Sequence, residues 1–194
     1  MNRRSRVLML VAAALLVLVR WGPLWEVRLH APQYPEGLGL HIRVNTVDGL
    51  KSGDLQSING LNHYIGMRAI EPDAIPELRW MPWIVAAFGV AAVTIAISGW
   101  RPLLMGWLLA FACLGAVGIW DFWRWEHNYG HNLDMEAAII IVPGMTYQPP
   151  LVGSKQLLNF RATAWPGTGA AAMGGSFLLG VVALAMSRRR KRAA

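Results

Sequence analysis

The chain contains a single cysteine, Cys113, among its 194 residues. One cysteine excludes an intrachain disulfide and a thiolate metal cluster. Cys113 stands inside an apolar run, where a small packing residue is favoured over a reactive thiol. Enzyme signatures are also missing, since there is no nucleophile elbow, no phosphate-binding glycine loop, no paired-cysteine motif and no haem-attachment motif. The sequence therefore predicts a protein that is not an enzyme.

Charge is absent from four apolar blocks. All eleven acidic residues and all five histidines fall within 20–81 and 121–168. Three of the blocks approach the roughly 20 residues that cross a bilayer as a helix, and the shorter first block is flanked by Arg6, Arg20 and Trp21, which can reach the headgroups. The fold class predicted is an α-helical membrane protein with four transmembrane helices. The blocks are Val7–Val19, Trp83–Ser98, Leu103–Trp120 and Gly169–Ser187.

The missing charge also limits what the helices can do. Transporters and proton pumps need ionisable or strongly polar groups near the middle of the membrane, and none of the blocks contains Asp, Glu, Lys, Arg or His. A haem held between helices normally needs a histidine within a helix. The sequence therefore disfavours ion transport through this chain alone and disfavours an intramembrane haem.

The first block has an alternative interpretation as a signal peptide, because a basic start precedes thirteen apolar residues. No A-x-A cleavage site follows it. Arg20-Trp21-Gly22-Pro23 comes next instead, so an uncleaved signal anchor is favoured.

The distribution of basic residues predicts the orientation. The pieces at one side of the predicted helices hold nine basic residues and no acidic residue, so both termini are expected in the cytoplasm. The basic tail is more typical of a membrane anchor than of a nucleic-acid-binding segment. The expected organisation is an anchor at 1–20, extracytoplasmic segments at 21–81 and 121–168, a helical hairpin at 82–120, a last helix at 169–187 and a cytoplasmic tail at 188–194.

The two extracytoplasmic segments contain patterns of strands. Leu24–His30, Leu38–Val47 and Leu158–Ala164 alternate apolar and polar residues, as half-buried strands require. Asp54 is expected to cap a short helix from about Leu55, and Glu71–Pro76 is expected to be extended. The strands are expected to join in one small mixed α+β domain on the helix ends.

Histidine and methionine recur at steps of four in these segments. Imidazole and thioether groups are ligands that suit Cu(I), and a step of four places both on one face of a helix. The poor helix formers Asn128, Tyr129 and Gly130 make that shared face doubtful, and isolated histidines and methionines more often hydrogen-bond backbone or fill packing gaps. The candidate metal ligands are His63, Met67, His127, His131, Met135 and Met145. His30 and His41 fit ordinary strand positions.

Several strings resemble those of a bacterial inner-membrane protein family that accompanies accessory factors for nitrous oxide reductase, a copper enzyme. They are Ala31–Leu38 (APQYPEGL), Asp54–Met67 (DLQSINGLNHYIGM), Tyr129–Asp134 (YGHNLD) and Val142–Phe160 (VPGMTYQPPLVGSKQLLNF). The resemblance implies a multi-span protein of the bacterial inner membrane whose segments face the periplasm and which supports maturation or copper supply of such an enzyme. Copper is then the implied cofactor, and other membrane or periplasmic subunits are the implied partners.

Two other functions fit the same sequence. The chain is equally compatible with a non-catalytic structural or docking subunit of a larger membrane oxidoreductase, since small residues on the last helix allow close lateral packing. An enzyme that binds a lipid or quinone near Asp121 and His127 is the less favoured third alternative.

Overall fold

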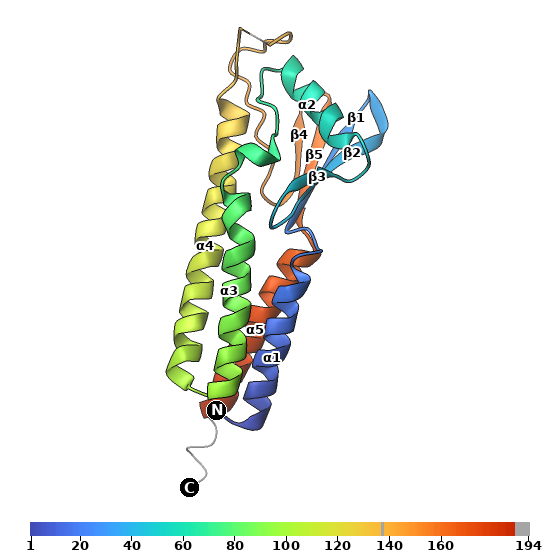
Figure 1. Cartoon of the computed structure of the whole chain (residues 1–194). Coiled ribbons are helices and arrows are strands. Elements are labelled where there is room, and N and C mark those ends of the chain that lie inside the picture. The colour runs from blue at the N-terminus through green and yellow to red at the C-terminus, as the bar shows by residue number, and fades with distance from the viewer. Residues whose placement is uncertain (137, 189–194) are drawn as a thin grey trace.

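The computed structural model describes residues 1–136 and 138–188. Four long helices form a bundle, and a mixed α+β domain stands at one end of it (Figure 1). The bundle helices are α1 (Arg3–Leu18), α3 (Glu77–Ser98), α4 (Arg101–His131) and α5 (Thr168–Arg188). The domain contains β1 (Trp25–Ala31), β2 (Tyr34–Ile42), β3 (Val47–Gly49), α2 (Asp54–Tyr64), β4 (Gly153–Leu157), β5 (Phe160–Pro166) and one 3-10 turn, η1 (Pro72–Ala74).

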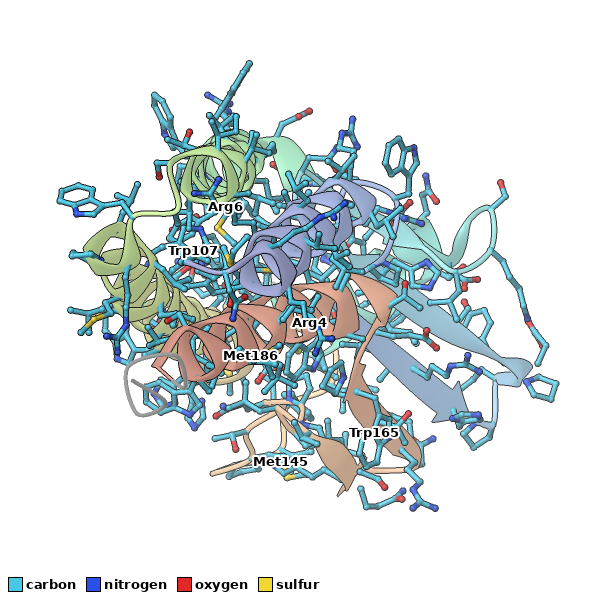
Figure 2. All side chains as sticks on the ribbon, turned by 90° about the horizontal axis from the view of Figure 1, so that it is seen from below. Arg4, Arg6, Trp107, Met145, Trp165 and Met186 are labelled. Carbon is cyan, nitrogen blue, oxygen red and sulfur yellow. The ribbon has the colours of Figure 1, made fainter. Side chains whose placement is uncertain are left out.

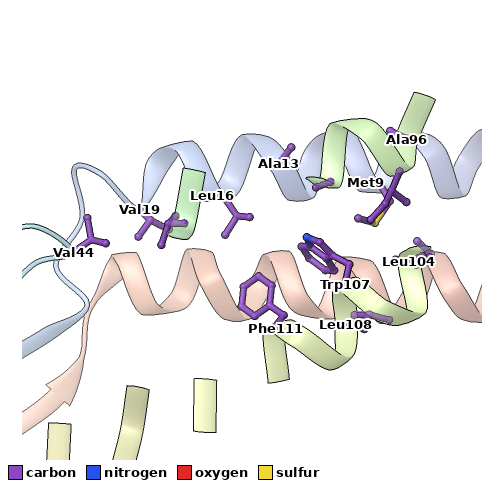
Figure 3. Packing of buried hydrophobic residues seen from close by; sticks show 14 residues of the cluster. Met9, Ala13, Leu16, Val19, Val44, Ala96, Leu104, Trp107, Leu108 and Phe111 are labelled. Atoms are coloured by element: carbon purple, nitrogen blue, oxygen red, sulfur yellow. The ribbon is translucent and has the colours of Figure 1, made fainter. Parts of the chain in front are cut away.

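The core of the bundle lies where α1 meets α3 and α5 and where the first part of α4 joins them. Met9, Ile95 and Leu104 are fully buried there. Trp107 packs edge-on against Phe111 with ring centroids 5.0 Å apart (Figure 3). It packs in the same way against Phe88 at 6.0 Å, and its indole nitrogen donates to the Phe88 carbonyl at 3.0 Å. Only the first three turns of α4 contribute to this core, so its remaining length stands beside the bundle.

Three helices of the described chain, α3, α4 and α5, are long and apolar enough to cross a membrane. α1 has 16 residues, fewer than the 21 of α5, and packs along α5. Ser5 donates to the Ala183 carbonyl and Ser176 donates to the Ala12 carbonyl, both at 2.9 Å. Near the domain, a Cβ built on Gly22 would lie 2.5 Å from the Thr168 hydroxyl. The segment that follows α1 and the start of α5 are therefore in close contact there.

The domain is a five-stranded antiparallel sheet in the order β3-β2-β1-β5-β4. It stands to the side of the bundle that carries α1 and α5 (Figure 2). β1 pairs with β5 from Trp25 opposite Pro166 to His30 opposite Arg161, so the prediction that the segments 21–81 and 121–168 contribute to one sheet is confirmed. Leu38, Leu40 and Val47 form the core beneath α2 with Ile58, while His30 and His41 lie on the other face of the sheet.

Four local predictions need correction. The second strand ends at Ile42, because the chain turns at Arg43–Thr46 before β3. Asp54 does not cap α2; Gly53 occupies that position, and the Asp54 carboxylate accepts from the Gly39 and Lys51 amides at 3.0 and 3.2 Å. Glu71–Pro76 is not wholly extended, since it contains η1. Cys113 is exposed rather than packed within the chain. The predicted tail 188–194 lies outside the described residues from position 189 onward.

Candidate functional site

The end of α4 carries the two histidines that the sequence places four residues apart. α4 does not stop near Trp120 but continues to His131, eleven residues and about 16 Å further. Trp123, His127 and His131 therefore share one helix face. The rings of Trp123 and His127 stack with centroids 5.2 Å apart, and those of His127 and His131 with centroids 3.9 Å apart. The doubt about a shared face was wrong, because the helix runs through Asn128, Tyr129 and Gly130.

The stacked pair limits how these imidazoles can bind a metal. Their planes are 23° from parallel, so the ring nitrogens, whose lone pairs lie in the ring planes, do not converge on one point in this arrangement. The Nδ1 atom of His131 contacts the His127 carbonyl at 2.9 Å, which leaves Nε2 for a ligand. Among residues 1–136 and 138–188, no group of three or more His, Cys, Asp or Glu side chains is arranged to hold a metal ion.

The other candidate ligands lie on segments that meet the end of α4. His63 is exposed in the last turn of α2, and half-buried Met67 follows Gly66. Asp134, next to the exposed Met135, donates its amide to the Gly66 carbonyl at 2.7 Å. Met145 is half-buried in the following segment, whose Tyr147 amide donates to the Gly130 carbonyl at 2.9 Å. The structure thus brings these segments together, and copper ligation by their side chains stays a prediction.

A buried carboxylate lies on another face of α4. Phe122, Glu126 and Gly130 are one turn apart. Phe122 packs against Trp25 of β1 with ring centroids 5.4 Å apart, and a Cβ on Gly130 would lie 2.4 Å from the Gln148 backbone. Glu126 is only 7% exposed, and neither of its carboxylate oxygens has a hydrogen-bond partner among the described residues. This face therefore packs under the domain with an unpaired acid within it.

Burial changes the protonation of this acid. Glu126 lies beyond the apolar part of α4, which ends at Trp120, and beyond the contact of Arg124 with Asp121 and Glu77 at the start of α3. Desolvation raises the pKa of the Glu126 carboxyl from 4.5 to about 7. This acid was not among the site residues predicted from the sequence, and the signal that could have found it is the helical step of four from Phe122 through Glu126 to Gly130.

The segment after α4 exposes apolar side chains at the end of the molecule farthest from the N-terminus (Figure 1). The backbone there is held in place, because the Ile139 and Ile140 amides donate to the Tyr64 carbonyl at 3.0 and 2.8 Å. The side chains nevertheless point outward. We name this set the distal apolar patch, and its members are Tyr64, Met135, Ile139, Ile140 and Ile141, exposed by 49, 45, 63, 49 and 53%.

Comparison with known proteins gives no match, either to a family model or to a curated protein.

Proposed function

We propose that this chain is an integral membrane accessory protein that docks a partner protein through the distal apolar patch. The observation that carries the proposal is the run of three exposed isoleucines, Ile139, Ile140 and Ile141, at the end of the domain away from the helices. Exposed apolar clusters of this kind mark interaction surfaces. Lipid does not cover this patch, because it lies beyond the end of α4, which already extends about 16 Å past its apolar part. A second protein is therefore the occupant.

The bundle supports a four-span arrangement with α1 as the additional span. α1 bonds to α5 at Ser5 and Ala183 and again at Ala12 and Ser176. The segment that follows α1 remains against the start of α5 at Gly22 and Thr168, so residues 5–22 cover the same depth as residues 168–183. Both termini then lie on one side of the membrane. We assign that side to the cytoplasm and the domain to the periplasm of a bacterial inner membrane, because the basic residues without acids gather at the termini and at Arg101.

The resemblance to proteins that accompany nitrous oxide reductase supplies the partner class. We propose that the patch docks a respiratory copper oxidoreductase of this type or one of its membrane-bound accessory proteins. The chain itself acts without turnover in this proposal. It would hold the partner at the membrane surface while the partner is matured.

The docking proposal is tested with the full chain in nanodiscs and purified nitrous oxide reductase, or its accessory proteins, as the soluble phase. Replacing Ile139→Asp and Ile141→Asp together is expected to weaken binding by at least about tenfold, because charges would be buried in the interface. Val152→Asp is the matched control, since Val152 is 53% exposed on another part of the domain. Equal affinity of both variants and the unchanged chain contradicts the proposal, as does self-association through the patch in place of partner binding.

A second function, copper supply to the same partner, is favoured by one specific observation. The structure places His127 and His131 in direct ring contact, on a helix end surrounded by the segments of Met67, Met135 and Met145. Imidazole and thioether ligands suit Cu(I), and a change of one ring to another side-chain rotamer would separate the stack. These residues would hold the ion loosely enough to pass it to a tighter site in the enzyme.

Titration with Cu(I) against a chromophoric chelator tests the copper proposal separately from docking. His127→Ala with His131→Ala is expected to abolish copper retention, whereas His30→Ala with His41→Ala is expected to leave it unchanged, because those histidines lie on the sheet. Copper retention by the His127 and His131 variant would contradict the copper proposal, and so would a loss of copper confined to the His30 and His41 variant. Neither result would affect the docking proposal.

A further inference from the structure

The end of the bundle that carries the N-terminus gathers positive charge from separate parts of the chain. Arg3, Arg4 and Arg6 lie in the first turns of α1, and Arg101 begins α4. Figure 2, which views this end directly, shows Arg4 and Arg6 on it. The acids nearest to these residues in the sequence lie away from this end: Glu26 is in β1, Glu77 begins α3 at its far end, and Asp121 is twenty residues along α4. None of the described residues at this end is therefore acidic.

Two cationic groups converge on the turn between α3 and α4. The N-terminal amine donates to the Gly99 carbonyl at 2.8 Å. The Arg6 guanidinium lies flat against Gly99, since a Cβ built there would lie 2.4 Å from an Arg6 nitrogen. Gly99 also has φ +65°, so glycine is favoured at this position for its backbone as well as for the space. α1 is thus fixed to the turn with its charges side by side.

Arg101 follows the same turn as the first residue of α4, two positions after Gly99. Its Nε atom is buried and has no hydrogen-bond partner among the described residues. A buried guanidinium donor without an acceptor is unfavourable, and neighbouring cations repel one another. An anion placed against Arg6 and Arg101 would accept these bonds and turn repulsion into attraction.

We propose that this end of the bundle, at Arg6 and Arg101 beside the Gly99 turn, binds the phosphodiester headgroup of an anionic phospholipid. The position fits a lipid, because the apolar lengths of α3 and α4 end here and the exposed Trp100 stands on the same turn, as aromatic residues do at a headgroup layer. The residue type fits as well. All described basic side chains at this end are arginine, which binds phosphate through two parallel donors, whereas Lys51 and Lys155 lie in the domain.

The net charge of the headgroup decides which lipid binds. A phosphatidylcholine phosphate carries its own ammonium group, which competes with the arginines. Phosphatidylglycerol has no such cation and leaves its full negative charge for Arg6 and Arg101. The site therefore prefers anionic lipid over zwitterionic lipid, and it does so independently of the docking and copper proposals.

The test uses the full chain purified in a neutral detergent and titrated with phosphatidylglycerol, phosphatidylcholine or inorganic phosphate. Bound lipid is counted by native mass spectrometry, and the melting temperature is followed in parallel. We expect phosphatidylglycerol to bind at least about tenfold more tightly than phosphatidylcholine and to raise the melting temperature. Arg6→Gln with Arg101→Gln should remove this preference, and Arg6→Lys with Arg101→Lys should retain part of it.

The control variant is Arg28→Gln with Arg161→Gln, which removes two arginines from exposed positions of the sheet and should leave lipid binding unchanged. Equal binding of the two lipids, or an unchanged preference in the Arg6 and Arg101 variant, would overturn the proposal. Displacement of phosphatidylglycerol by millimolar inorganic phosphate would overturn it too, because the site would then be one for free anions. If the double glutamine variant does not fold, the comparison of headgroups on the unchanged chain and the single Arg6→Gln variant decide the matter.

Discussion

At the scale of single residues, Glu126 of α4 is a buried acid that packs under the domain. An ionised carboxylate that is 7% exposed and lacks a described partner is destabilising, so the folded protein favours its neutral form. Protonation of Glu126 therefore contributes to the unfolding free energy. This contribution is fully present below the unfolded pKa of about 4.5 and is lost as the pH rises through the folded pKa of about 7. The loss is on the order of 2–3 kcal/mol at pH 8.

Replacement of Glu126→Gln should remove this dependence. We expect position 126 of the variant to contribute little to the change of the unfolding free energy between pH 5 and pH 8. At pH 8 the variant should be at least as stable as the unchanged chain. Chemical denaturation of the chain in nanodiscs at several pH values measures both effects. Glu36→Gln, at an exposed position of β2, is the matched control and should keep the full pH dependence. A pH dependence that persists in Glu126→Gln contradicts the assignment.

Gly130 shows how a close contact reverses the usual effect of a helical glycine. Glycine in a helix normally costs up to about 1 kcal/mol relative to alanine. At Gly130 an added methyl group would meet the Gln148 backbone at 2.4 Å, so the segment carrying Tyr147 would have to move.

We therefore expect Gly130→Ala to destabilise the domain by about 1–3 kcal/mol. Gly60→Ala should instead be neutral or stabilising, because Gly60 stands inside α2 with nothing within 4 Å of the added group. Thermal unfolding of both variants provides the comparison, and a stable Gly130→Ala variant would show that the segment does not rest on α4.

At the scale of elements, α1 and α5 form the most extensive helix pair of the bundle. Two buried serines each donate to a carbonyl of the opposite helix, Ser5 to Ala183 and Ser176 to Ala12. Such bonds between helices in a membrane contribute about 0.6 kcal/mol each on average. They also fix the register of α1 against α5, which places the start of β1 beside the end of β5.

Replacing Ser5→Ala and Ser176→Ala together should lower the unfolding free energy by about 1 kcal/mol. Steric trapping in bilayers can measure a change of this size. Thr94→Ala is the control, since the Thr94 hydroxyl donates to the Val90 carbonyl of its own helix at 3.0 Å and faces outward. If Thr94→Ala lowers the unfolding free energy as much as the double serine variant does, the bonds between α1 and α5 contribute no more than a bond within one helix.

The elements also show where local patterns mislead. The existence of β1, β2, β5 and α2 followed from alternation and turn residues, because these patterns report which face is buried. β3 and β4 were not predicted as strands of their own, and the last strand begins at Phe160 rather than Leu158. The end of α4 did not follow, since Asn128, Tyr129 and Gly130 have weak intrinsic helix preference. A contact with a distant residue, the bond from the Tyr147 amide to the Gly130 carbonyl, stabilises the helix there together with the local stacking of His127 on His131.

At the scale of the whole molecule, the proposed topology places the domain and the termini on opposite sides of the membrane. Single-cysteine variants in a Cys113→Ser background test this directly. Lys51→Cys and Gln156→Cys, both exposed on the domain, should react with a membrane-impermeant maleimide in intact spheroplasts. Arg3→Cys should react only after the membrane is disrupted. Labelling of Arg3→Cys in intact spheroplasts would contradict α1 as a fourth span.

The sequence alone determined the elements whose cause is local. Apolar blocks without charge predicted the long helices, because a charged group within a bilayer is costly, and strand alternation predicted which residues of β1 and β2 face the core. Only the tertiary structure decided how these elements meet. The pairing of β1 with β5, the burial of Glu126 under the domain and the meeting of Arg6 with the Gly99 turn depend on how the elements pack, and that geometry is set by contacts between residues far apart in the chain.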